Sequence, residues 1–516
     1  MINITSRGLT FSIFRIQYIM ITYKKFLTDS VNYNVDDFSE KWEQAISSSE
    51  ELRVALELME KIEGLYPDGE IFIVGGDPRD LLMGNEVDDV DMATNISFED
   101  LSKHFSLKNI SKSDSQPVYT ILYKKYAYDL AKFREDDQSE MGRQSNVSTE
   151  VDSFETDTKR RDISINSFGL DYKGRIVDYQ GGLDDLKNKL IRAVGNAGER
   201  FKEDATRILR VFRFAAKMDF EIEEETLRSA TELKDLLLNP QLISQESIAQ
   251  EFYKSAKSGR TLSNFLQKLQ DAGILYDILP EFTNMEPLTH NPKHHPEGGS
   301  TVLGHIHECL KASPYNDPII NLAVLFHDFG KATTRGDKNG HMTYYGHESA
   351  GVPIVENIFK RLKFNNLGPN DKKNILAAVA KHMLVHNLDD LNVKTLRKLI
   401  HDPSWETIKA VSFCDEASRG SGMFNAEEFN AKIDRAEAKL NTVPGGAAAL
   451  KKQISELING NKFLEWFPEF NEDRKQIGQY LPKLQDYVAE LILTGKPVDE
   501  NMVYRKAKQI VPGHSK

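Results

Sequence analysis

The sequence predicts a multidomain α+β protein, in which a small mixed-sheet head precedes helices that run to the end of the chain. At 516 residues the chain is too long for one hydrophobic core. Short strand-like runs gather in residues 71–133, whereas residues 244–440 show helical spacing broken by proline and glycine. We expect five segments, which are an N-terminal extension (1–40), the head (41–195), a helical neck (196–285), a further helical domain (286–430) and a helical tail (431–516).

Composition narrows the class of protein. Charged residues make up 28% and hydrophobic residues 40%, as in an ordinary globular protein. Cys309 and Cys414 are the only cysteines, so we expect no disulfide framework and a reducing, cytoplasmic location. No apolar run approaches the ~20 residues that cross a bilayer, so no membrane partner is expected. The net charge of −12 argues against broad nucleic-acid binding but permits a local basic groove.

Residues 1–28 carry four basic side chains and no acid, which is typical of a targeting segment. Met20 offers the alternative of a later start, and the segment is excluded from the fold. Residues 41–66 then show the apolar spacing of a helix.

The head begins with a strand at residues 71–74 that runs into Gly75 and Gly76, where the backbone can approach a ligand closely. A second strand is expected around residues 87–92, and a hairpin should pair 118–123 with 126–133. Residues 135–158 are polar without an apolar period, which predicts a loop over one sheet edge.

Three carboxylates in these strands suit a metal site. Alternation along the second strand places Asp89 and Asp91 on one face, where they repel each other unless a cation lies between them. Asp129, in the middle of a strand, is the candidate for a third. Such a site suits Mg²⁺ held against a triphosphate. The alternatives are a solvated turn for Asp89 and Asp91 and an exposed edge residue for Asp129.

Two further motifs suit a nucleotide. The adjacent Arg160 and Arg161 fit a phosphate or the sugar edge, and Asp162 with Asn166 suits ribose hydroxyls. Residues 203–213 are predicted to form one helix, with Asp204 and Arg207 together on one face. An Asp acceptor beside an Arg donor matches the edge of cytosine and of adenine, but not that of guanine or uracil. The alternatives are a solvated arginine pair and a simple salt bridge within the helix.

With these motifs in this order, the head resembles that of class II CCA-adding tRNA nucleotidyltransferases, relatives of bacterial poly(A) polymerase with a DNA polymerase beta-like head. The resemblance covers about residues 65 to 480. It implies that Asp89 and Asp91 bind catalytic Mg²⁺ with support from Asp129. It also implies that Gly75, Gly76 and Arg79 contact the triphosphate of a nucleotide. The sugar would be contacted by Arg161, Asp162 and Asn166. The base would be contacted by Asp204 and Arg207, with Arg210 and Arg213 behind them. Its partners would be tRNA, ATP and CTP.

The chain departs from the family pattern in three places. Pro78 replaces a hydrophobic residue before Arg79, and the residues after Asp162 read Ile-Ser-Ile-Asn-Ser where the family has Phe-Thr-Ile-Asn-Ala. The neck motif expects an arginine near Ser247, ahead of Glu251. This last departure puts in doubt how the neck braces the base-reading pair.

A second metal site is predicted in residues 286–430. His327 and Asp328 follow an apolar helix. Together with His305, His347, His382 and Asp415 they resemble the ligand set of HD-type metal-dependent phosphohydrolases. Histidine with carboxylate suits Mg²⁺ or a divalent transition metal. Either His305 or His307 could supply the first metal ligand of this set, since the two lie only two residues apart. The predicted ligands are His305, His327, Asp328, His347, His382 and Asp415.

The resemblance implies an enzyme that adds and repairs the 3′-terminal CCA of tRNA, with an HD domain that acts as a 2′,3′-cyclic phosphodiesterase, 2′-nucleotidase or phosphatase. Two alternatives stay open. One is a poly(A) polymerase or a partial CC- or A-adding enzyme, and the other is a non-catalytic RNA-binding head serving an HD hydrolase. The oligomeric state is left open.

Overall fold

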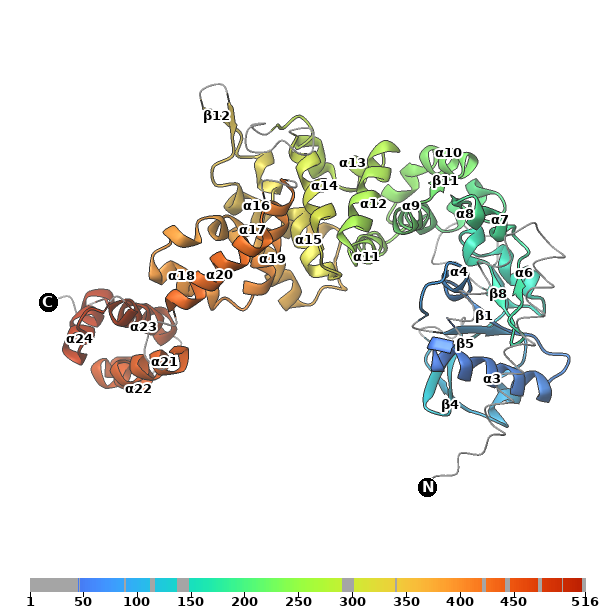
Figure 1. Ribbon diagram of the computed structural model, residues 1–516, viewed down its shortest axis with the longest axis horizontal. Coiled ribbons are helices and arrows are strands. Elements are labelled where there is room, and N and C mark those ends of the chain that lie inside the picture. Colours follow the sequence, from blue (N-terminus) through green and yellow to red (C-terminus); the bar gives the residue numbers. More distant parts are fainter. Residues whose placement is uncertain are drawn as a thin grey trace. The chain divides into compact units, whose positions relative to one another are not determined.

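The computed structural model describes residues 45, 47–87, 90–111, 117–136, 148–289, 301–338, 341–419, 424–440, 446–471, 476–493 and 495–512. The chain divides into two compact units, one of Met1–Glu251 with Asn264–Ile278 and the other of Phe252–Ser263 with Leu279–Lys516 (Figure 1). The mixed-sheet head and the helical remainder confirm the predicted α+β class. Within the described residues, no helix is long and apolar enough to cross a membrane.

The first unit is built on a seven-stranded sheet in the order β3-β4-β5-β2-β1-β8-β9. Its β2–β5 pair is parallel and the other pairs are antiparallel, so the sheet is mixed as predicted. The strands are β1 (Ile71–Val74), β2 (Asp91–Thr94), β3 (Ser106–Asn109), β4 (Val118–Tyr123), β5 (Tyr126–Lys132), β8 (Gly169–Leu170) and β9 (Ile176–Val177). Helix α3 (Glu50–Leu65) precedes β1, and its buried residues recur at the spacing of one helical face.

Two predictions about the head needed correction. The second strand begins at Asp91 and not near residue 87, and Asp89 lies outside the described residues. The predicted loop at 135–158 contains the hairpin of β6 (Arg134–Asp136) and β7 (Ser148–Glu150), followed by helix α6 (Phe154–Lys159). Phe154 explains the error, because this single aromatic is buried against Phe72 and Phe133 and anchors a segment that is otherwise polar.

The predicted single helix at 203–213 is two helices. Helix α8 (Ala197–Glu203) ends at Asp204, whose backbone is extended, and α9 (Thr206–Met218) begins two residues later. The Asp204 carboxylate causes the break, since its Oδ1 accepts a hydrogen bond from the Thr206 N–H at 2.9 Å. Aspartate commonly competes with the helix in this way. Asp204 and Arg207 therefore do not share a helical face.

Short elements complete the first unit. They are α4 (Asp77–Leu82), α5 (Phe98–Ser102), η1 (Ser164–Asn166), α7 (Gly182–Lys187), the parallel pair β10 (Leu190–Ile191) and β11 (Glu221–Ile222), α10 (Glu224–Glu232), η2 (Lys234–Leu238) and α13 (Leu275–Ile278). The division between the units falls within helices α11 (Gln245–Ser255) and α12 (Gly259–Asp271).

In its described residues the second unit is helical, as predicted, apart from one antiparallel hairpin. Its elements are η3 (Pro280–Asn284), α14 (Val302–Ala312), α15 (Pro318–Phe326), η5 (Phe329–Ala332), β12 (Gly336–Lys338), β13 (His341–Thr343), α16 (His347–Arg361), α17 (Pro369–His386), η6 (Leu388–Asp390), α18 (Val393–Ile400), α19 (Trp405–Ala417) and α20 (Ala426–Leu440). Helices α21 (Gly446–Leu457), α22 (Gly460–Trp466), α23 (Ile477–Leu493) and α24 (Glu500–Ile510), with η7 (Pro468–Asn471), enclose an apolar cluster of their own.

Glycine is required where η5 meets α16. A Cβ atom at Gly330 would overlap the backbone carbonyl of His347 and approach the backbone of Gly351. This close approach brings the turn after His327 and Asp328 against the first residue of α16. Two predicted ligand segments are thereby placed in contact.

Candidate functional site

The head brings two predicted carboxylates together. Asp91 on β2 is paired in parallel register with Asp129 on β5, so the two residues lie side by side. Thr120 on β4 donates to Asp129 Oδ1 at 2.9 Å, which orients that carboxylate. A third acid, Asp77, accepts a hydrogen bond from the Asp91 N–H at 3.2 Å. Burial, together with the nearby Asp91 and Asp80 carboxylates, raises the pKa of Asp77 to about 7.

This concentration of acid fits a divalent cation. Neighbouring carboxylates repel one another without a positive charge between them, and oxygen ligands of this kind suit Mg²⁺. Asp77 was not predicted as a site residue, although it directly follows Gly75 and Gly76, which were. Asp89 was predicted here and lies outside the described residues.

Arg79 lies buried at the end of the glycine turn. Gly75 has φ +82°, which few other residues adopt, and a Cβ on Gly76 would lie 3.0 Å from the Arg79 guanidinium. Arg79 Nη2 pairs with Asp80 at 2.8 Å, and its Nη1 donates to the side-chain oxygen of Asn166. Two predicted nucleotide-binding residues that lie far apart in the sequence are therefore in contact.

The adjacent arginines share a buried carboxylate that was not predicted. Asp157 on α6 is inaccessible to solvent and accepts from Arg160 Nη2 at 2.7 Å and from Arg161 Nη2 at 2.8 Å. Burial raises the pKa of Asp157, but the two guanidinium groups outweigh burial and hold that pKa below its usual value. Asp157 fixes Arg161 in the head. The sequence does not indicate its role, because residues 135–158 are mostly polar and lack an apolar period.

Asp162 connects the head to helix α9. Its Oδ2 accepts from Arg210 at 2.6 and 2.8 Å, while its Oδ1 accepts from the Ile163 N–H at 2.9 Å and from Asn166 at 3.4 Å. Burial raises the pKa of Asp162, and the Arg210 guanidinium more than offsets this, so that the pKa lies below its usual value. Arg207, Arg210 and Arg213 form a row of arginines on α9. The ionised Asp162 thus holds Arg210 of this arginine row.

The predicted base-reading pair has a different geometry from the one expected. Arg207 Nη1 pairs with Glu203 at 2.7 Å, and its Nη2 donates to the Arg160 carbonyl at 2.8 Å. Asp204 is engaged through Oδ1 with the start of α9. Arg213 pairs with Glu251 on α11, so the neck glutamate braces the arginine row even though Ser247 stands where the family pattern has an arginine.

In the second unit, three histidines are oriented alike. The Nδ1 atoms of His327, His347 and His382 lie 2.7, 2.9 and 3.0 Å from backbone carbonyls three residues earlier. A ring held through Nδ1 presents Nε2 as the lone-pair donor to a metal. The buried His327 Nε2 makes no hydrogen bond.

The Asp328 carboxylate lies at the centre of this cluster. Its Oδ2 is 3.4 Å from His327 Nε2 and 3.7 Å from His305 Nε2, and its Oδ1 is 3.3 Å from His347 Nε2. His347 Nε2 in turn lies 3.3 Å from His382 Nε2. Among the residues that the structure describes, the potential metal-ligating atoms form two groups, each with its members within 4.8 Å of one another. One group contains His305, Cys309, His327 and Asp415, and the other contains Asp328, His347 and His382.

These donor atoms fit divalent metal ions. Buried imidazole nitrogens that converge on carboxylates, one of them unsatisfied, are the arrangement expected around such ions. His307 is turned away from the cluster, since its Nδ1 lies 3.0 Å from Ser263 Oγ. Of the two candidates for the first metal ligand, the geometry therefore favours His305. Asp415 lies 3.0 Å from His305 Nε2.

His386 was not predicted and belongs to the same neighbourhood. Its Nε2 pairs with Asp415 Oδ2 at 2.8 Å and its Nδ1 with Glu416 at 3.1 Å. Burial lowers the pKa of His386, but these two carboxylates outweigh burial and raise it to about 9. His386 follows His382 by four residues on α17, and this spacing indicates that the two side chains lie on the same helical face.

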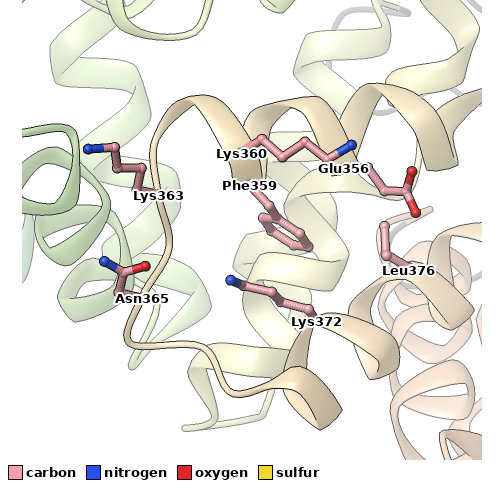
Figure 2. Close-up of a pocket in the computed structure, with 7 residues that line it drawn as sticks. All are labelled: Glu356, Phe359, Lys360, Lys363, Asn365, Lys372 and Leu376. Atoms are coloured by element: carbon pink, nitrogen blue, oxygen red, sulfur yellow. The ribbon is translucent and has the colours of Figure 1, made fainter.

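A pocket of about 500 Å³ opens onto this cluster, which gives a substrate access to it. Asp328, Lys331 and His386 line it, and Tyr345 at its edge is 76% exposed. A separate pocket of about 370 Å³ is formed by α16, α17 and the turn between them (Figure 2). Its lining includes Lys360, Lys363 and Lys372 around Phe359, and none of the predicted site residues.

Comparison with known families defines the class. Residues 71–192 match the model of the poly A polymerase head domain, and residues 294–404 match that of the HD domain. The chain therefore combines a poly A polymerase head domain with an HD domain.

Several solved structures that match this fold are of CCA-adding enzymes. The Bacillus stearothermophilus enzyme in complex with CTP matches with a TM-score of 0.55 and 19% identity, over 89% of this chain and 98% of that one. An apo form of a CCA-adding enzyme matches with a TM-score of 0.54 and 16% identity, over 92% and 98%. The Thermotoga maritima enzyme complexed with tRNA_CCA matches with a TM-score of 0.50 and 18% identity, over 91% and 97%. At these identities the likeness establishes the fold.

Proposed function

We propose that the head adds and repairs the 3′-terminal CCA of tRNA, using CTP and ATP without a nucleic-acid template. The observation that supports this most strongly is the placement of Asp91 beside Asp129, with the Asp91 N–H bonded to Asp77, the residue that follows the glycine turn. The fold is that of CCA-adding enzymes, one of them in complex with CTP and another with tRNA_CCA. A poly(A) polymerase or a partial CC- or A-adding enzyme remains the alternative, because all of these select CTP or ATP with similar chemistry.

In this reaction the 3′-hydroxyl of the RNA attacks the α-phosphorus of the nucleotide, and pyrophosphate leaves. Bound Mg²⁺ would stabilise the charge that develops on the attacking and leaving oxygens. Asp89, Asp91 and Asp129 would hold the ions. Gly75, Gly76 and Arg79 would hold the triphosphate.

The same proposal assigns the sugar and base contacts. Arg161 would lie at the sugar side, fixed by Asp157, with Asp162 and Asn166 beside it. Asp204 and Arg207 would read the base, and Arg210 and Arg213 would support them from α9. Because Arg207 pairs with Glu203, its guanidinium has a defined position before a nucleotide arrives.

Addition of single labelled nucleotides tests this proposal. The purified protein is incubated with tRNA that ends before CCA, after its first C, after its second C or after the complete CCA, with one labelled nucleotide at a time. We expect C on the first two ends, A on the third, nothing on complete tRNA, and no use of GTP or UTP. Asp91→Ala should lose all incorporation, whereas Asp68→Ala, which changes an exposed acid of the same unit, should not. Runs of A on any RNA would favour the polymerase alternative.

We propose in addition that the HD domain hydrolyses phosphate at RNA ends. His305, His327 and Asp415 would hold one divalent ion and His347 with His382 a second, with Asp328 between them. Two ions on either side of one carboxylate suit water attack on phosphorus. Opening a 2′,3′-cyclic phosphate and removing the resulting monoester would leave the hydroxyl that the head extends.

Release of phosphate from 2′,3′-cyclic nucleotides tests the second activity. We expect His327→Ala to abolish it, since the variant removes a ligand that has no other hydrogen-bonding role through Nε2. The matched control is His401→Ala, an exposed histidine outside the cluster. Hydrolysis that survives in the His327 variant would place this activity elsewhere.

A further inference from the structure

Helix α14 places a cysteine next to the predicted metal ligands. Cys309 follows His305 by four residues, so the two side chains lie on the same helical face. Its Sγ is 3.4 Å from His305 Nε2, the atom that also lies 3.0 Å from Asp415 Oδ1. Cys309 is fully buried and is not in a disulfide.

A second observation shows that this side of the cluster is built for a ligand. His327 Nε2 is buried and makes no hydrogen bond, with Asp328 Oδ2 3.4 Å away, and His327 and Cys309 belong to a group whose potential ligand atoms lie within 4.8 Å of one another. An unsatisfied buried nitrogen is costly unless something binds it. The separation between His305 Nε2 and Cys309 Sγ also suits a shared ion, because nitrogen and sulfur ligands on one tetrahedral metal lie about 3.5 Å apart.

We propose that Cys309 is a ligand of the ion held by His305, His327 and Asp415. The proposal rests on the HD metal site and extends it from an imidazole and carboxylate set to one that includes sulfur. When the ion binds, the Cys309 S–H bond breaks, the sulfur bonds the metal, and the proton passes to solvent.

A sulfur ligand should change which metal ion the HD domain binds most tightly. Thiolate sulfur favours softer ions over Mg²⁺, while the second group, made of Asp328, His347 and His382, contains no sulfur. The two positions in the cluster should therefore differ in preference. The group that contains Cys309 should select Ni²⁺, Co²⁺ or Zn²⁺ most strongly.

Absorption spectroscopy of the metal-loaded full chain tests the assignment. The protein is stripped with a chelator and titrated with Co²⁺ or Ni²⁺, while near-ultraviolet absorption reports sulfur-to-metal charge transfer and bound metal is counted by elemental analysis. We expect the band in the wild type and in Cys414→Ser, which changes the other buried cysteine. We expect it to disappear in Cys309→Ser and in Cys309→Ala, with affinity for Ni²⁺ reduced by about 10-fold or more.

The outcomes separate this proposal from the HD metal site itself. Metal bound by the wild type without a charge-transfer band, or a band that persists in folded Cys309→Ala, would overturn the role of Cys309 and leave the HD site standing. A wild type that binds no metal, or a His327→Ala variant that binds it as tightly as the wild type does, would overturn the HD site as well. Circular dichroism of each variant checks that it has folded.

Discussion

Asp157→Ala should be one of the most damaging substitutions in the head, although Asp157 belongs to no predicted motif. Its carboxylate accepts from Arg160 at 2.7 and 3.0 Å, from Arg161 at 2.8 and 3.2 Å, and from the Arg134 N–H at 3.1 Å. Removing it leaves two largely buried guanidinium groups without the carboxylate that both of them bind.

The magnitude follows from burial. Breaking a buried ion pair by deleting one partner costs about 3–5 kcal/mol. The Arg160 and Arg161 side chains remain 18% and 12% exposed, so water can partly solvate them and we expect the lower end, about 3 kcal/mol. Glu155→Ala is the matched control on the same helix. Its partner Lys159 is 3.3 Å away, both side chains are more than half exposed, and the expected cost is ~0–0.5 kcal/mol.

Urea unfolding at several pH values measures this difference. Because the folded-state pKa of Asp157 is lowered, its stabilisation is complete above the unfolded value of 3.8 and is lost as pH falls through the folded value. The gap between wild type and Asp157→Ala should therefore be constant near neutral pH and should narrow in acid. The variant should also bind CTP and ATP more weakly, because Arg161 is no longer held by a carboxylate. This difference should be seen at nucleotide concentrations that do not saturate the protein. A variant within about 1 kcal/mol of wild type at pH 7 would refute this reasoning.

The remaining predictions concern the two sites. Asp91→Ala should abolish nucleotide addition with CTP and ATP alike while the thermal midpoint stays near that of the wild type, and substantial incorporation would contradict the metal assignment. Asp204→Ala or Arg207→Ala should relax discrimination against UTP and GTP by about 1–3 kcal/mol, measured as the ratio of kcat/KM values; an equal fall for all nucleotides would mean that the pair only positions the substrate. Asp328→Ala should remove cyclic-phosphate hydrolysis and leave nucleotide addition unchanged, and a parallel loss of both would implicate the HD domain in holding tRNA. After chelation, Mg²⁺ should restore addition, whereas hydrolysis should require a transition metal.

Strands with a strong local signal were predictable from the sequence. The apolar run of β1 (Ile71–Val74) and the alternation through β4 and β5 have the predicted bounds to within one residue. The order of histidines and aspartates also anticipated the convergence of His327, Asp328 and His347.

Features that depend on tertiary contacts were not predictable. The break at Asp204 depends on one side chain outcompeting helix propensity, and nothing in the spacing of residues 203–213 indicates it. Asp157 matters only because Phe154 anchors α6 against the sheet and so buries the acid beside two arginines. His386 and Cys309 lie one turn from predicted ligands, and only the packing of α14, α17 and α19 shows that they face the same cluster.

The 3′ ends of the reaction product provide the most direct test of the central proposal. A tRNA that lacks its terminal CCA is incubated with the protein, Mg²⁺ and all four nucleoside triphosphates, and the ends are then sequenced. We expect the products to end in CCA and not to grow further on prolonged incubation, and we expect Asp91→Ala to leave the RNA unchanged. Tails of repeated A, ends that stop at CC, or an active Asp91 variant would contradict the proposal.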